Sequence, residues 1–326
     1  MKRTCVPSRE PTRRTLVPGP FLLLSGVLAL LGVTWPGGNT EAAQCQRNVV
    51  ANVVALDQPL MFNRLGAQNV NGMMFALRRD VVDRNEVPLT QGGAAVPGEV
   101  ALRPDKRPRP LVLRVAAGDC LTINLQNLLA YQANPNNPDD PLFKKDEQVA
   151  DRHVGLQVNG MQAVNAAGDI ASNAGRNDNS LIPPGGSRSY TLYAEREGAF
   201  AASSYGATFG GEGSGGNTAN GLFAQVVVLP RGARTYRNVI TEEEMRLATT
   251  GRTPAGQPII DYEARYPQAS PWTEEGKGGL PIIAMMDNGE IVASDTDAVV
   301  MGPNPDGSFP ASTYPLESYG KRNPAL

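Results

Sequence analysis

The sequence predicts an all-β protein: a Greek-key β-sandwich, followed by a short helix and the beginning of a second β domain. Three observations predict this class. The 35 glycines and 27 prolines favour short strands joined by turns. Several apolar runs are rich in β-branched residues or alternate with polar positions. Long connections separate some of these runs, as Greek-key topology requires. With 41% hydrophobic residues in a chain of 326, a sizeable core is expected.

Residues 1–43 predict a signal peptide. A basic stretch is followed by an apolar run at residues 21–33, and small residues near position 42 suit cleavage. The apolar run is shorter than the about 20 residues that span a bilayer. Arg13 and Arg14 precede it, so the twin-arginine and the general export routes both stay open. We therefore expect a periplasmic or secreted protein with no membrane span after signal removal.

Two cysteines remain after signal removal, because Cys5 leaves with the leader. Cys45 and Cys120 are an even pair in an oxidising compartment, which suggests one disulfide between the start of the mature chain and a later strand. The alternative is two buried thiols. A formal net charge of -2 provides no basic field, so nucleic acid is not an expected partner.

The first domain is placed at residues 45–230. Its expected strands lie at residues 48–55, 111–115, 120–125, 153–158, 190–195 and 222–229. Tyr190 and Leu192 alternate with Thr191 and Tyr193, which predicts a strand with two unlike faces. The polar, proline-containing residues 79–98 are expected to form a surface connection.

Residues 231–326 predict a linker, a short helix and a partial second β domain. Thr241 can cap the helix and Glu244 can complete a capping box. Asn288 and Gly289 follow Asp287 between two apolar runs and predict a hairpin. We expect nothing later in the chain to pair with or cover the strands after residue 281. An open edge is normally covered, so the protein would continue past Leu326 or pair with another chain.

Five segments carry a family resemblance: residues 118–128 (GDCLTINLQNL), 152–155 (RHVG), 182–186 (IPPGG), 198–200 (GAF) and 221–223 (GLF). In order and spacing they resemble the N-terminal cupredoxin domain of large multidomain bacterial multicopper oxidase-like proteins. The resemblance extends over most of residues 46–326 and implies a cupredoxin-like sandwich. It implies as partners further cupredoxin domains, in the same protein or on a partner chain.

Copper is the cofactor that the resemblance implies. Such oxidases hold a mononuclear copper with two His and one Cys, and a trinuclear cluster with His-X-His pairs. The first pair corresponds here to residues 153–157, which keep one imidazole, and the second to residues 200–206, which have none. His153 is the single histidine of the chain. It is the candidate metal residue that the resemblance leaves, and a structural histidine in a strand is the stronger interpretation. The chain alone therefore cannot build either copper site.

Three functions follow as hypotheses. The leading one is an exported, non-catalytic cupredoxin-like scaffold domain, the N-terminal part of a multicopper oxidase-like protein. The second is an oxidoreductase of the multicopper oxidase type, whose copper ligands lie beyond Leu326 or on a partner chain. The third is a secreted carbohydrate- or protein-binding β-sandwich that uses the glycine-rich loop at residues 210–221. Enzymatic activity is expected only if missing domains complete the protein, and no catalytic or cofactor-binding residue is assigned.

Other motifs have ordinary interpretations. Residues 211–216 match G-x-G-x-x-G, but a strand rather than a helix is expected to follow, so a turning loop is the better interpretation. Adjacent methionines point to opposite faces of a strand and favour core packing over a cuprous site. The remaining weak candidates are Ser203 and Ser204 as nucleophiles, Asp139, Asp140, Asp295 and Asp297 as calcium ligands, and the pairs Met73, Met74, Met285 and Met286.

Overall fold

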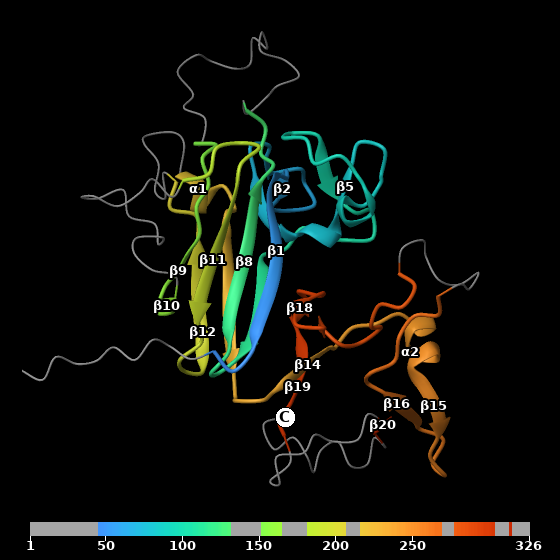
Figure 1. Ribbon diagram of the computed structural model, residues 1–326. Helices are drawn as coiled ribbons and strands as arrows, with labels where there is room; N and C mark the ends of the chain where they lie inside the picture. Colours follow the sequence, from blue (N-terminus) through green and yellow to red (C-terminus); the bar gives the residue numbers. More distant parts are fainter. Residues whose placement is uncertain are drawn as a thin grey trace, which may run out of the picture. The chain divides into compact units, whose positions relative to one another are not determined.

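The structure is a computed structural model, and Figure 1 shows its course. It describes residues 45–131, 151–164, 181–206, 216–268 and 277–303, together with the backbone of residues 313 and 314. The described residues all belong to one compact unit. The predicted signal peptide lies outside the described residues. The observed elements are nearly all strands, which confirms the all-β class.

Strand β1 (Asn48–Asp57) lies inside a seven-stranded sheet, as its run of β-branched residues predicted. Along one edge it pairs in parallel with β8 (Cys120–Asn127), over eight residue pairs. Part of its other edge pairs antiparallel with β4 (Met73–Leu77). Beyond β8 the sheet continues through β11 (Ser187–Tyr193) to β10 (Gln162–Ala163). Figure 1 shows β1, β8 and β11 side by side.

A second sheet has four strands in the order β7 (Leu111–Ala116), β13 (Phe223–Leu229), β12 (Gly198–Ser203) and β9 (Gln157–Val158). The pair β7–β13 is parallel, and the other two pairs are antiparallel. The turn after β7 leads into β8, so it carries the chain from this sheet to the other one. Gly118 occupies this turn with φ +90°, a conformation that favours glycine.

Buried side chains from both sheets form one core, which makes the two sheets a sandwich. Tyr190 and Leu192 are buried in it while Thr191 and Tyr193 are only partly buried, which confirms the predicted alternation on β11. The other contributors include Val53 and Ala55 from β1, Ile123 and Leu125 from β8, Leu113 and Val115 from β7, and Val226 and Val228 from β13. The fold therefore follows from strands whose apolar residues recur every second position.

Residues 78–102 differ from the expected surface connection. They form η1 (Arg78–Asp80), β5 (Val81–Asp83), η2 (Leu89–Gln91) and β6 (Val100–Leu102), and β5 pairs with β6. Asp83 organises this segment, because its carboxylate accepts backbone N–H groups of Asn85, Val87 and Ala94. Val81 and Leu89 cover a second buried cluster on the outer face of β1 and β4. A few apolar residues with local polar support were enough to make a covering layer.

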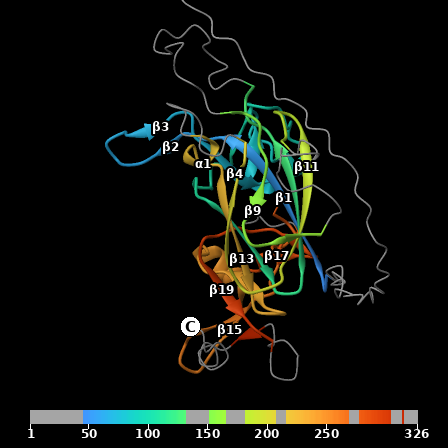
Figure 2. The same ribbon diagram turned by 90° about the vertical axis from the view of Figure 1, so that its left-hand side faces the viewer.

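Two smaller elements complete the sandwich. The strands β2 (Leu60–Met61) and β3 (Gln68–Asn69) form a hairpin, visible in Figure 2. The helix α1 (Gly216–Ala219) has four residues and precedes β13. We expected a strand directly after the glycine-rich motif at residues 211–216, but one short turn of helix comes before the strand. Residues 211–215 lie outside the described residues.

After residue 230, strand β14 (Arg234–Arg237) pairs with β19 (Ala298–Met301). Strands β15 (Thr249–Arg252), β16 (Pro258–Asp261) and β20 (Thr313–Tyr314) form a three-stranded sheet. Buried residues around Tyr236 and Ile282 form a separate core cluster.

Helix α2 (Glu242–Ala248) starts at the predicted capping box. The Thr241 hydroxyl accepts the N–H of Glu244, and the Glu244 carboxylate accepts the N–H of Thr241. These two bonds satisfy amides that a helix start leaves without intrahelical partners. The predicted helix is therefore confirmed.

The predicted hairpin consists of β17 (Met286–Asp287) and β18 (Glu290–Ile291). Asn288 and Gly289 both have positive φ at its turn. The strands after residue 281 pair with earlier strands of the chain, so the edge that we expected to stay open has partners. β18 pairs in parallel with β1 at Val50, next to the part of that edge taken by β4, and β19 pairs with β14.

Candidate functional site

The two segments that the family resemblance assigns to copper ligands lie against each other. Residues 153–155 and 204–206 meet through Ser204, whose hydroxyl accepts the N–H of Gly155 at 3.3 Å. Asn217 from α1 donates to the Ser204 hydroxyl and to the carbonyl oxygen of His153, at 3.3 and 3.0 Å. Asn127, at the end of β8, donates to the carbonyl of Arg152 and so fixes where this segment begins.

Tyr205 packs closely against this contact. A Cβ atom on Gly155 would lie 2.1 Å from Cζ of Tyr205, so only glycine leaves room for the ring. The Tyr205 hydroxyl hydrogen-bonds with Tyr190, whose burial raises its pKa well above the ordinary value. A phenol ring, an amide and a hydroxyl therefore lie between the two segments. This donor set does not fit copper, which prefers imidazole and thiolate.

His153 contributes its backbone carbonyl to that contact. Its side chain is 51% exposed, and Nδ1 lies 3.0 Å from a carboxylate oxygen of Asp151. Among the described ranges, no group of three or more His, Cys, Asp or Glu side chains could hold a metal ion. Cys45 and Cys120 are joined by a disulfide, with Cα atoms 5.2 Å apart. Their sulfur atoms therefore serve as a cross-link between the start of β1 and β8.

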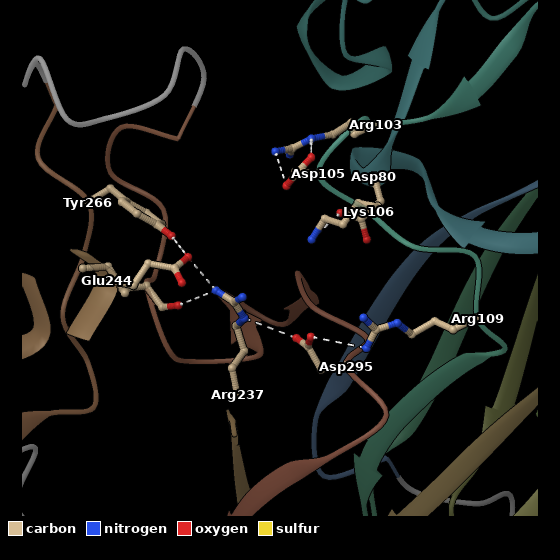
Figure 3. Close-up of polar contacts among 10 residues, drawn as sticks. Asp80, Arg103, Asp105, Lys106, Arg109, Arg237, Glu244, Tyr266 and Asp295 are labelled. Carbon is tan, nitrogen blue, oxygen red and sulfur yellow. Dashed lines mark hydrogen bonds and ion pairs between the residues drawn. The ribbon is translucent and has the colours of Figure 1, made fainter. Parts of the chain in front are cut away.

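A charged cavity of about 400 Å³ is the second candidate site. The segment at residues 79–109 lines it together with residues after 237 and the loop that follows β18. Figure 3 shows the polar contacts around it. The cationic lining residues are Arg79, Arg103, Lys106, Arg109, Arg237 and Lys277, and the acidic ones are Asp80, Asp105, Glu244, Asp295 and Asp297.

Glu244 is the most strongly perturbed carboxylate at the cavity. Burial alone would raise its pKa, but the hydroxyl of Tyr266, the N–H of Thr241 and the charge of Arg237 lower it to about 2. Burial and the hydrogen bond to Glu244 in turn raise the pKa of Tyr266 well above its ordinary value. The pair holds its protons in fixed places at neutral pH, which suits a structural contact and not proton transfer.

Asp295 connects the two sides of the cavity. Its carboxylate lies 3.3 Å from Nε of Arg237 and 4.0 Å from a guanidinium nitrogen of Arg109, as Figure 3 shows. Arg103 pairs with Asp105 at 3.0 Å and Lys106 with Asp80 at 3.3 Å. Most charges at this site are therefore neutralised by a neighbour, and the arrangement can bind a ligand rather than activate one.

The weaker sequence candidates do not converge on a site. The buried Ser204 hydroxyl accepts hydrogen bonds from Gly155 and Asn217, and Asp295 is an ion-pair partner of two arginines. Met73 and Met74 belong to two different core clusters, which confirms that they pack on opposite faces of β4. Met285 is buried and Met286 packs against the sandwich core. Asp139 and Asp140 lie outside the described residues, as does most of the loop at 210–221.

Sequence reasoning missed the charged cavity. Its lining comes from Arg79 and Asp80, at the start of the expected surface connection at residues 79–98, from residues 103–109, and from residues 237 onward. One signal was available: arginines and aspartates recur through residues 78–109, beside apolar residues such as Val81 and Leu102. Only the pairing of β5 with β6 brings Arg79 and Arg103 to the same end of a strand pair.

No protein-family model matches the chain, and no curated protein matches it. Among solved structures, the chain is similar to a multi-copper oxidase from Pseudomonas thermotolerans, with 14% identity and a TM-score of 0.31 over 56% of this chain and 30% of that one. It is also similar to the blue copper oxidase of Nitrosomonas europaea, with 13% identity and a TM-score of 0.32 over 61% and 42%. The copper nitrite reductase of the same organism has 14% identity and a TM-score of 0.30 over 57% and 42%. The matched part thus spans less than half of each of these proteins. Within the described residues, no helix is long and apolar enough to cross a membrane.

Proposed function

We propose that the chain is an exported, non-catalytic scaffold domain of cupredoxin-like architecture, the N-terminal part of a multicopper oxidase-like protein. One observation carries this proposal: Tyr205, Ser204 and Asn217 occupy the contact where the resemblance would place imidazoles. With one histidine in the chain and Cys45 bonded to Cys120, a His₂Cys copper site cannot be assembled. The disulfide supports an oxidising compartment, either periplasmic or extracellular.

Metal analysis of the purified, exported chain tests the first part of this proposal. We expect no stoichiometric copper after incubation with Cu(I) or Cu(II) and gel filtration, for the native chain and for His153→Ala alike. One tightly held copper per native chain, lost in His153→Ala, would overturn the scaffold assignment.

The hairpin formed by β2 and β3 supports the proposal that the chain is one part of a larger protein, because it offers a surface for a further domain. Met61 and Phe62 are each 68% exposed and Leu65 is 95% exposed, although all three are apolar. The turn is preorganised, because the Asn63 side chain accepts the N–H of Leu65 and Phe62 donates to the carbonyl of Ala67. Exposed apolar side chains gathered on one element mark interaction surfaces. We therefore place the docking of a further domain, or of a partner chain, at this hairpin.

Amide hydrogen exchange, measured in the isolated chain and in the assembly with its partner, tests this docking site. In the assembly purified from its source, we expect slower exchange at residues 60–69 than in the isolated chain, with the hairpin at 286–291 unchanged as the control. Equal exchange at residues 60–69 would remove the hairpin from the proposal. Copper in the assembly and none in the isolated chain would favour an oxidoreductase completed by other domains.

A further inference from the structure

Arg79 occupies an unusual position in the charged cavity. It belongs to η1, and the backbone N–H of Arg103 donates to the carbonyl of Asp80 at 3.0 Å, so the chain holds Arg79 and Arg103 near each other. The neighbouring Arg78 is bonded elsewhere, to the side chain of Gln126 and the carbonyl of Leu89. The backbone thus separates two consecutive arginines, one bonded within the sandwich and one at the cavity.

The guanidinium of Arg79 forms no hydrogen bond or ion pair with the described part of the chain. Burial lowers its pKa; the charge of Asp80 opposes this, and the charge of Arg103 adds to it. Each other arginine at the cavity has a carboxylate partner: Asp105 for Arg103, and Asp295 for Arg109 and Arg237. A partly buried cation without such a partner gains free energy from any anion that reaches it.

Arg79 lines two adjoining cavities, of about 400 and about 620 Å³. Both volumes lie in the range of small-molecule pockets, roughly 300–1,000 Å³. The larger cavity also contains Glu86 and Glu290, whose negative charges disfavour an anion there. The smaller one has six cationic and five acidic lining residues, a surplus of one positive charge.

The smaller cavity also has an apolar wall. Val239, Ile240, Pro281 and Val292 line it beside the ring of Tyr266. A ligand matched to this lining has one negative group for the surplus positive charge and an apolar body for the wall. A guanidinium binds carboxylate and phosphate groups through two parallel N–H bonds.

We propose that the smaller cavity binds a small organic anion, whose single carboxylate or phosphate group pairs with Arg79 and whose apolar body lies against Val239, Ile240 and Pro281. This site is independent of the scaffold role. Its presence would make the domain a ligand-binding module whether or not copper domains accompany it.

Binding of benzoate, acetate and inorganic phosphate to the exported chain, measured by titration calorimetry at low ionic strength, tests the site. We expect benzoate to bind more tightly than acetate, because only benzoate reaches the apolar wall. Arg79→Gln should weaken benzoate at least tenfold, which corresponds to about 1.4 kcal/mol. Arg64→Gln is the matched control, because Arg64 is exposed in the hairpin loop and lines neither cavity.

The affinities for inorganic phosphate and for acetate show whether the anionic group of the ligand is a phosphate or a carboxylate. Phosphate binding that Arg79→Gln abolishes, stronger than that of acetate, would identify a phosphate-bearing ligand, and the reverse order a carboxylate. Arg79→Gln should fold normally, since the guanidinium that it removes makes no hydrogen bond or ion pair with the described residues, and its thermal unfolding checks this. The proposal is overturned if none of the three anions binds at millimolar concentration, or if both variants bind benzoate as the native chain does.

Discussion

Replacing Glu244 with glutamine removes one charge from the contact between helix α2 and the cavity. In the folded chain this carboxylate accepts hydrogen bonds from Tyr266, from the N–H of Thr241 and from Arg237. Glu244 is only 7% exposed, so water screens these contacts little. The variant keeps the shape of the side chain and removes its ionic partnership with Arg237.

The magnitude follows from the pKa. It falls from 4.5 to about 2 on folding. Since one pKa unit corresponds to about 1.4 kcal/mol, the ionised carboxylate adds roughly 3 kcal/mol to the free energy of unfolding. A lowered pKa gives stability that is fully present above pH 4.5 and is lost as the pH falls towards 2. Glu244→Gln should therefore be less stable at neutral pH and lose less stability on acidification.

Urea unfolding from pH 7 down to about pH 2 measures both effects. The matched control is Glu243→Gln, the next residue, whose carboxylate forms an exposed pair with Arg246 at 2.6 Å. Exposed pairs of this kind contribute little, so the control should follow the native chain. The reasoning is refuted if Glu244→Gln and Glu243→Gln lose the same stability at pH 7, or if the acid-dependent loss of Glu244→Gln equals that of the native chain.

Three further predictions concern the sandwich. Cys45→Ser with Cys120→Ser opens a cross-link between residues 75 apart, and should lower the free energy of unfolding in urea by about 4 kcal/mol. Gly155→Ala should cost about 1–3 kcal/mol by the same assay, because the added Cβ meets a tyrosine ring. The cost should vanish when Tyr205→Ala is the background. One hydrogen bond contributes about 1 kcal/mol to the free energy of unfolding. Asn127→Ala should cost more than this, because it leaves two buried carbonyls without this donor. No change in any one of these measurements would contradict the corresponding contact.

Local patterns carried most of the information about individual elements. The alternation at Tyr190 and Leu192, the capping box at Thr241 and the turn at Asn288 each depend on a few neighbouring residues, and the structure has all three. The physical reason is that side-chain period, helix capping and positive φ are properties of short segments.

Long-range pairing was not predictable in the same way. The sequence near Glu290 predicts a hairpin, but no local pattern there predicts that the hairpin pairs with β1. The paired residues, Val50 and Glu290, are 240 positions apart. The charged cavity was missed for the same reason, because Arg79 and Asp295 meet only after the fold is complete. At the segment of His153, the resemblance indicated two segments, and the structure shows that Ser204 and Asn217 hold them together.

The pairing of β18 with β1 has a consequence for how the protein is made. Because translation runs from the N-terminus, β1 leaves the ribosome before β18, the edge partner that is synthesised some 240 residues later. At the usual elongation rates of about 5–20 residues per second, the edge of β1 at Val50 stays unpaired for roughly ten seconds or more before β18 is made. During this time it is accessible to chaperones and to other nascent chains. Closing such a distant contact also makes folding slow.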